Sequence, residues 1–248
     1  MKTVGVIPAR YQSSRFPGKP LALIAGKTLI ERVWRQASGS RQLDDLVIAT
    51  DDKRILECAR SFGARVVMTS PSCACGTDRL AEVARRSEKN ASAFINIQGD
   101  EPLLSPSLID RLVLTLKKNP GIPAVTAAFP LKDEGEISNH NVVKVVTDER
   151  KCALYFSRCP IPFERTEGTG AWFKHLGIYG YRRSFLLRYA SWPPTALERT
   201  ESLEQLRILE KGYQIKVVLS QHDSFGVDTP SDVRKIEKLL KSRPGGAQ

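Results

Sequence analysis

The chain has 248 residues, and its 38 lysines and arginines against 27 aspartates and glutamates give a formal net charge of +11. Apolar residues make up 41% of it, as in ordinary globular proteins, and no apolar run approaches the roughly 20 residues of a membrane-spanning helix. Five scattered cysteines favour free thiols over a disulfide framework or a zinc site, and the first residues lack the pattern of a secretory signal, so we expect a cytoplasmic protein without membrane insertion.

The first half of the chain alternates between strand and helix patterns. Apolar runs predict strands at 4–7, 46–50, 64–69 and 93–98. Apolar residues at helical spacing predict helices at 27–37, 51–63, 76–86 and 105–118. Because strands separated by helices of this length pair in parallel with right-handed crossovers, the pattern predicts a layered α/β fold with a mostly parallel sheet.

The second half of the chain changes character. Three consecutive runs with turn signals between them predict antiparallel strands at 124–131, 141–148 and 152–158. Helices are predicted at 181–190, at 197–212 and from about 230, with a strand at 214–220 before the last of them. We therefore expect one α/β domain over 1–248 with an inserted β-rich subdomain at about 125–180.

A basic loop follows the first predicted strand. In VIPARYQSSRFPGKP, residues 6–20, the cations Arg10, Arg15 and Lys19 occur with no acidic residue before Glu31. The spacing matches neither a P-loop nor a dinucleotide-binding turn. In open parallel sheets ligands bind at the carboxyl ends of the strands. The loop is therefore either a solvated basic segment or a site for a polyphosphate, which arginine and lysine suit.

Two carboxylates also follow predicted strands. Asp100 lies in QGDEP after the strand at 93–98, and Asp228 lies in GVDTPSD after the strand at 214–220. Each could simply cap a turn or a helix. Together, opposite three cations, they fit a Mg²⁺–nucleotide site, because Mg²⁺ takes one or two carboxylates and completes its shell with water and phosphate oxygens.

The remaining candidates are individually weak. Gly76 could let a base approach the backbone, and Arg79 could contact a nucleotide or serve as a structural arginine. His175 and Tyr179 alternate onto one face of a predicted strand, where a lone histidine is more often structural. The pair at 204–205 lies inside the predicted helix 197–212, where Glu and Gln usually face solvent.

The net charge has two explanations, a nucleic-acid surface or a site for an acidic metabolite. The basic pairs at 85–86, 117–118 and 182–183 are dispersed, as on solvated helix faces, and no zinc finger, RNA-binding aromatic signature or helix-turn-helix is evident. We therefore expect no nucleic-acid partner.

Seven motifs, in this order, resemble those of the 3-deoxy-manno-octulosonate cytidylyltransferases, the CMP-Kdo synthetase family. The resemblance extends from about Val4 to Val233. The motifs are IPARYQSSRFPGKPL, GTDR, NIQGDEP, YFSRCPIP, KHLGIYGYR, ESLEQLR and GVDTPSD.

The resemblance implies a reaction, a fold and an assembly. CTP and 3-deoxy-D-manno-octulosonate (Kdo) would give CMP-Kdo and pyrophosphate with Mg²⁺, for lipopolysaccharide biosynthesis. The fold would be a Rossmann-like nucleotide-diphospho-sugar transferase fold, and the protein a homodimer whose insertion serves dimerisation and sugar binding.

The resemblance also implies roles for residues. Arg10, Arg15 and Lys19 would bind the triphosphate. These three residues and Asp100 would act in catalysis. The cytidine would face Gly76, Arg79 and Gln98, and Mg²⁺ would be bound by Asp100 and Asp228. The sugar pocket would be lined by Arg158, His175, Tyr179, Glu204 and Gln205.

The chain departs from the family pattern at Cys75, where a serine usually precedes the Gly-Thr of GTDR. A thiol is a weaker hydrogen-bonding group than a hydroxyl, so we expect modestly weaker nucleotide binding. Two alternatives stay open: a cytidylyltransferase for 8-amino-Kdo or sialic acid, and a basic nucleic-acid-binding protein.

Overall fold

The computed structural model describes residues 1–12 and 16–242. Within them the strands of a nine-stranded sheet are β1 (Thr3–Ala9), β4 (Asp45–Thr50), β5 (Arg65–Met68), β6 (Ala93–Asn96), β7 (Ala124–Leu131), β8 (Lys144–Thr147), β9 (Ala153–Ser157), β10 (Trp172–Arg182) and β11 (Ile215–Leu219). A short hairpin of β2 (Leu23–Ile24) and β3 (Lys27–Thr28) lies outside this sheet.

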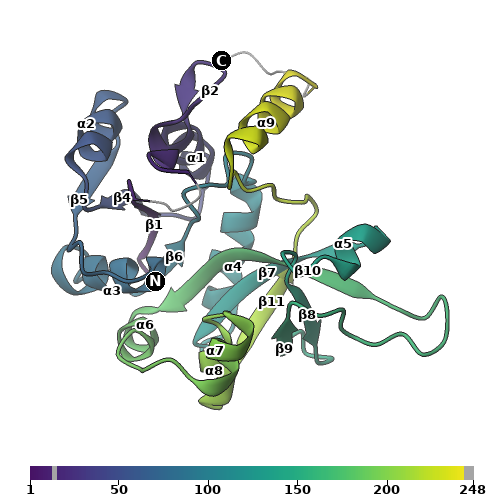
Figure 1. Cartoon of the computed structure of the whole chain (residues 1–248). Coiled ribbons are helices and arrows are strands. Elements are labelled where there is room, and N and C mark those ends of the chain that lie inside the picture. Colours follow the sequence, from purple (N-terminus) through teal and green to yellow (C-terminus); the bar gives the residue numbers. More distant parts are fainter. Residues whose placement is uncertain (13–15, 243–248) are drawn as a thin grey trace.

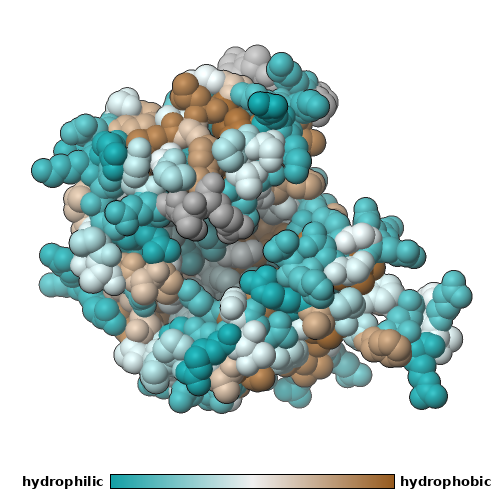
Figure 2. Space-filling model, in the orientation of Figure 1, coloured by the Kyte–Doolittle hydropathy of each residue, from teal (hydrophilic) through white to brown (hydrophobic). Residues whose placement is uncertain are grey.

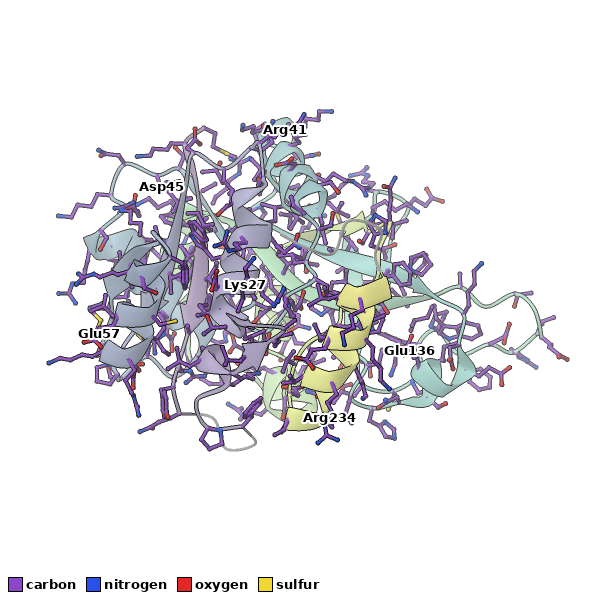
Figure 3. The ribbon with its side chains drawn as sticks, turned by 90° about the horizontal axis from the view of Figure 1, so that it is seen from above. Lys27, Arg41, Asp45, Glu57, Glu136 and Arg234 are labelled. Atoms are coloured by element: carbon purple, nitrogen blue, oxygen red, sulfur yellow. The ribbon has the colours of Figure 1, made fainter. Side chains whose placement is uncertain are left out.

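Helices cover both faces of the sheet (Figure 1). On one face the core includes residues of α1 (Leu29–Ser38), α2 (Lys53–Ser61), α4 (Pro106–Lys118) and α9 (Pro230–Ser242). On the other face it includes residues of α3 (Gly76–Arg86), α6 (Arg183–Tyr189) and α8 (Leu206–Glu210). The short elements η1 (Lys19–Leu21), α5 (Glu134–Ser138) and α7 (Ala196–Glu201) complete the set. Charged side chains such as those of Arg41, Glu57 and Arg234 project from the outer surface (Figure 3).

The strand order β11-β7-β10-β6-β1-β4-β5 confirms the predicted α/β class. β1 pairs in parallel with β4 and β6, and β4 with β5, as the alternation of strands and helices predicts. β10 is antiparallel to both β6 and β7. The region 125–180 thus supplies β7 and β10 to the central sheet, while β8 and β9 pair beside β10.

The prediction of one continuous helix at 197–212 is wrong, because the chain forms two separate helices there, α7 and α8. Ser202 ends α7 in the left-handed conformation, with φ of 52°. The buried Arg207 guanidinium donates to the Glu198 carboxylate across the break. In one continuous helix these residues, nine apart, would be separated by about 13 Å along the axis, too far for an ion pair. The ion pair therefore needs the break.

No helix within the described ranges is long and apolar enough to cross a membrane.

A buried ammonium group joins the strands beside β10 to their loops. Lys144, on β8, is fully buried, and burial lowers the pKa of its amine. Its Nζ donates to the carbonyl oxygens of Asn139 at 3.0 Å, Val142 at 2.6 Å and Arg158 at 2.6 Å. One side chain thereby links the turn before β8 to the end of β9.

We expect Lys144→Met to lower the free energy of unfolding by about 3 kcal/mol, because it removes three hydrogen bonds that join separate segments of the chain. Urea denaturation would measure the change. Lys89→Met, at an exposed lysine, is the control and should change stability by less than about 0.5 kcal/mol. Equal effects of the two substitutions would contradict this role of Lys144.

Candidate active site

A cavity of about 300 Å³ lies where the carboxyl ends of β1 and β6 meet β10. Figure 2 shows a hydrophilic face that is hollowed between the part of the molecule carrying α9 and the part carrying β10. Most of the predicted site residues line this cavity: Arg10, Gly76, Gln98, His175, Tyr179, Glu204 and Gln205. Residues from five separate segments therefore meet in one cavity.

The basic loop carries two described cations, and one of them lines the cavity. Arg10 lines the cavity, and its guanidinium donates to the Ala74 carbonyl at 2.8 Å. Gly18, with φ of 72°, donates its N–H to the Tyr11 carbonyl and closes the loop. Lys19 follows as the first residue of η1. Arg15 lies outside the described residues.

Lys19 joins the two predicted metal ligands. Its Nζ lies 2.7 Å from Asp100 Oδ2 and 3.5 Å from Asp228 Oδ1. The three charged groups are therefore neighbours, as the carboxyl-end argument predicts. A cation already lies at the carboxylate pair, and two carboxylates are the donor number that Mg²⁺ uses beside phosphate oxygens. The described residues contain no cluster of three or more acidic, histidine or cysteine ligands.

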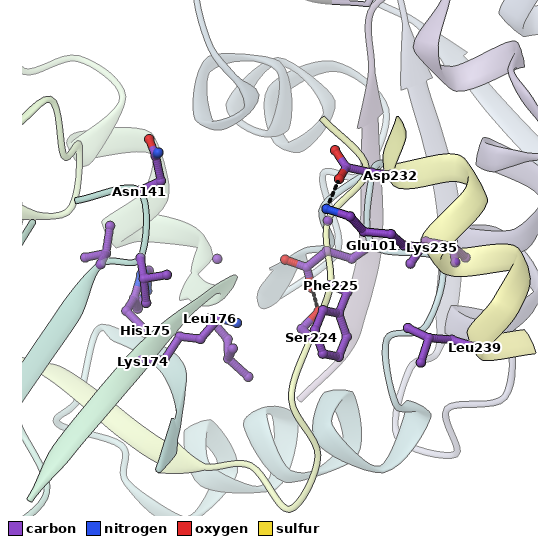
Figure 4. Close-up of a pocket in the computed structure, with 15 residues that line it drawn as sticks. Glu101, Asn141, Lys174, His175, Leu176, Ser224, Phe225, Asp232, Lys235 and Leu239 are labelled. Carbon is purple, nitrogen blue, oxygen red and sulfur yellow. Dashed lines mark hydrogen bonds and ion pairs between the residues drawn. The ribbon is translucent and has the colours of Figure 1, made fainter. Parts of the chain in front are cut away.

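Direct contacts join the loops that carry the two carboxylates. The Val227 N–H donates to the Asp100 carbonyl at 2.9 Å, and the Ser224 hydroxyl donates to the Glu101 carboxylate (Figure 4). Burial raises the pKa of Glu101 to about 7. Asp223 forms an ion pair with Lys174 of β10 at 3.0 Å. The spacing of the two carboxylates is thus fixed by neighbours that carry no predicted role.

A second cavity of about 400 Å³ lies between β10 and α9. Figure 4 shows Lys174 and His175 on one side of it and Glu101 and Phe225 on the other. His175 and Gly177 line both cavities, so the two are parts of one cleft.

His175 is a neutral hydrogen-bonding group. Burial lowers its pKa to about 3. Its Nε2 lies 3.0 Å from the Thr126 hydroxyl, which donates its own hydrogen to the Ile178 carbonyl at 2.8 Å. With the hydroxyl hydrogen directed to that carbonyl, the matching tautomer carries the ring hydrogen on Nε2 and has an acceptor at Nδ1. The histidine can therefore accept a hydrogen bond from a ligand hydroxyl.

Two further side chains present polar atoms to the cavity near His175. The Tyr179 hydroxyl is buried and, among the described residues, has no hydrogen-bond partner. The Gln98 amide donates to the Gly177 carbonyl at 2.7 Å, which fixes its orientation. An unpaired buried hydroxyl in a cavity wall is a group that a polar ligand would satisfy.

The break between α7 and α8 turns Glu204 and Gln205 into the cavity, where a continuous helix was expected to direct them to solvent. Thr77, in the first turn of α3, donates its hydroxyl to Glu204 Oε2 at 3.0 Å. Cys75 is the N-cap of α3 and makes no side-chain capping bond. Burial and the Glu204 carboxylate raise the pKa of its thiol to about 12, so the thiol is neutral.

Of the predicted site residues that the structure describes, five line neither cavity: Lys19 with its partners Asp100 and Asp228, and the arginines Arg79 and Arg158. Arg79 is fully buried, with its guanidinium 2.9 Å from Asp51 and hydrogen-bonded to Thr69. Arg158 donates to the carbonyl groups of Glu201 at 2.8 Å and His140 at 3.0 Å. Both arginines connect chain segments in this structure, and their contacts with substrate stay predictions.

Sequence reasoning missed Asn96. It lies at the end of β6 and lines the cavity, and its buried Oδ1 has no hydrogen-bond partner among the described residues. The signal was present in AFINIQ, where one polar residue interrupts a buried apolar strand.

Comparison with known proteins gives a consistent result. The family model described as Cytidylyltransferase matches residues 4–216. A 3-deoxy-manno-octulosonate cytidylyltransferase of Solibacter usitatus is 51% identical over 97% of this chain and 95% of its own length. The mitochondrial enzyme of that name in Arabidopsis thaliana is 47% identical over 98% of this chain and 84% of its own. The solved structure of CMP:2-keto-3-deoxy-manno-octonic acid synthetase complexed with CTP matches with a TM-score of 0.93 and 39% identity, covering 97% and 99% of the two chains.

The depressed pKa of His175 predicts an acid-dependent loss of stability. The folded state stays unprotonated there down to about pH 3, whereas an unfolded histidine titrates near 6.5. Between these values the unfolded state binds more protons, so stability falls as the pH drops below about 6.5, by up to about 1.4 kcal/mol per pH unit. Urea denaturation at pH 7.0, 5.5 and 4.5 would show a shallower loss for His175→Gln. The exposed His140 is the control, and His140→Gln should keep the slope of the unmodified protein. An unchanged slope in His175→Gln would contradict the prediction.

Proposed function

The chain belongs to the cytidylyltransferase family, and from that premise we propose that it transfers CMP from CTP to Kdo and releases pyrophosphate. The observation that carries the proposal is the contact of Lys19 with both Asp100 and Asp228 at the end of a basic loop whose Arg10 lines a polar cavity. Relatives named as enzymes of this reaction match nearly the whole chain, which supports the same reaction. The product CMP-Kdo would supply lipopolysaccharide biosynthesis.

The cations would act on the triphosphate. In the transfer, the anomeric hydroxyl of Kdo would lose its proton to water and its oxygen would form a bond to the α-phosphorus. The bond from that phosphorus to the bridging oxygen would break, and pyrophosphate would leave with additional negative charge. Arg10 offers a forked donor for phosphate oxygens, and Lys19 a point charge beside them. Since these groups are already positioned, their contribution is to orient the phosphates and stabilise the developing charge.

Asp100 and Asp228 are the residues that would bind Mg²⁺. When bound, the ion would neutralise phosphate charge and polarise the α-phosphoryl group. Lys19 lies between the two carboxylates here, and the negative phosphates of CTP give its ammonium an alternative partner. The contacts of Val227 and Ser224 keep the carboxylates together while that exchange takes place.

The wall of the cavity opposite the basic loop would bind the sugar. Neutral His175 offers an acceptor at Nδ1, and Tyr179 offers a buried hydroxyl. Gln205 and Glu204 line the same cavity. Such groups suit the hydroxyls of a sugar acid, and their placement sets which acidic sugar fits.

We also propose a homodimer built on the β-rich side of the molecule. Phe163 is 86% exposed in the segment between β9 and β10, and Leu154 of β9 is 61% exposed. Large apolar side chains this exposed are typical of surfaces that a partner covers.

Pyrophosphate release with Mg²⁺ tests the proposal. CTP and UTP would each be assayed against Kdo, 8-amino-Kdo and sialic acid. We expect release with CTP and Kdo alone. Release with CTP and another acidic sugar would keep the nucleotide site and replace the proposed sugar, whereas no release with any pair would overturn the reaction.

We expect Asp100→Asn to lower the rate at saturating substrates by about 10²- to 10³-fold, as for loss of one charge-stabilising group. It should also weaken Mn²⁺ binding at least tenfold in the presence of CTP, measured by electron paramagnetic resonance. Glu149→Gln, at an exposed carboxylate after β8, is the control and should change neither quantity. Normal Mn²⁺ affinity in Asp100→Asn would remove Asp100 from the metal site.

A further inference from the structure

A groove of about 430 Å³ lies between α4 and the edge strand β11, and no residue of the active-site cleft lines it. Four of its lining residues are cations: Arg111, Lys118, Lys151 and Lys216. None of its lining residues is acidic. We refer to these four cations and the space between them as the basic groove.

The charges of the basic groove are not balanced within the molecule. Among the described residues, none of its four cations forms an ion pair. By contrast, Lys19, Lys174 and Arg207 each have a carboxylate partner. Like charges gathered in one concavity repel each other, and the repulsion is removed when an anion binds.

Ordered backbone positions the cations of the basic groove. Arg111 and Lys118 lie about two turns apart on α4, and therefore on one face of that helix. Lys216 belongs to β11, and its Nζ donates to the Arg150 carbonyl. The Val217 N–H donates to the Lys151 carbonyl at 2.8 Å, which attaches the turn before β9 to the strand edge. Three separate segments thus direct positive charge into one space.

Apolar side chains accompany the charges. Leu114, Val217 and Leu219 line the groove, and Leu114 is 37% exposed. The combination suits a ligand with several negative charges and a nonpolar portion. The concave shape and limited volume favour a small molecule over a flat bilayer or a nucleic-acid duplex.

We propose that the basic groove binds a soluble small molecule that carries two or more phosphate groups. The Arg111 guanidinium would form paired hydrogen bonds to one phosphate, and the lysines would supply point charges to the others. The site is separate from the cleft that contains Lys19 and Asp100, so it would be occupied independently of the substrate. It also explains part of the net positive charge that the active site leaves unassigned.

Inorganic tripolyphosphate is the probe, titrated by calorimetry in buffer of low salt without Mg²⁺. The background variant Lys19→Ala weakens binding in the active-site cleft and leaves the groove intact. We expect this variant to bind one equivalent, with an affinity that falls steeply as salt is added. Adding Arg111→Glu and Lys118→Glu should weaken that binding at least tenfold.

The matched control reverses two exposed cations elsewhere, Arg85→Glu and Lys89→Glu, in the same background. Because the change in net charge is identical, an equal loss of binding in the control would overturn the proposal, as would full binding in the groove variant. Circular dichroism checks folding, and Arg111→Gln with Lys118→Gln should show a smaller loss of affinity in the same direction.

A second experiment tests whether the phosphate groups belong to a soluble molecule or to lipid headgroups. Vesicles of phosphatidylcholine with and without phosphatidylglycerol would be sedimented with the unmodified protein and the groove variant. We expect no difference between the two proteins. Groove-dependent binding to the anionic vesicles, together with no binding of tripolyphosphate, would assign the groove to lipid headgroups and overturn the soluble ligand.

Discussion

Two carboxylates held side by side repel each other, and the arrangement of the cleft depends on how that repulsion is offset. Asp100 and Asp228 come from loops far apart in the sequence, and Lys19 lies between them. The backbone bond from Val227 to Asp100 and the bond from Ser224 to Glu101 connect the two loops directly. The chain thus keeps a cation between the two carboxylates, and it fixes their spacing through direct hydrogen bonds between the two loops.

The antiparallel placement of β10 supplies the other half of the site. An all-parallel sheet presents loops at its carboxyl edge, whereas β10 runs in the opposite direction between β6 and β7. It brings the middle of a strand, with His175 and Tyr179, to the cavity. A strand holds side chains more rigidly than a loop does, so the wall assigned to the sugar is the stiffer part of the cleft.

Local patterns in the sequence predicted most of the fold. Strands β1, β4, β5 and β6 and helices α1 to α4 follow from apolar spacing, because each buries one face against the same sheet. Lys19, Asp100 and Asp228 are neighbours because the loops that carry them follow strands that end at one edge of the sheet. The break before α8 escaped prediction, since it depends on the ion pair of Glu198 with Arg207 and not on local propensity. Arg79 was ambiguous for a related reason, as an arginine in a helix gives no sign that its partner is Asp51.

Lys144, which lines neither cavity, differs from Lys19 in the kind of partner it has. Its ammonium is fully buried and is satisfied by three peptide carbonyl groups, whereas Lys19 faces carboxylates and is partly accessible to solvent. Mobile ions screen charges that they can approach, and they cannot reach a buried ion–dipole contact. The wall of the cleft that Lys144 ties together therefore keeps its shape as ionic strength rises, while the electrostatic capture of substrate at the basic loop weakens. Added salt would therefore lower the association rate of a charged ligand without changing the structure of the cleft wall.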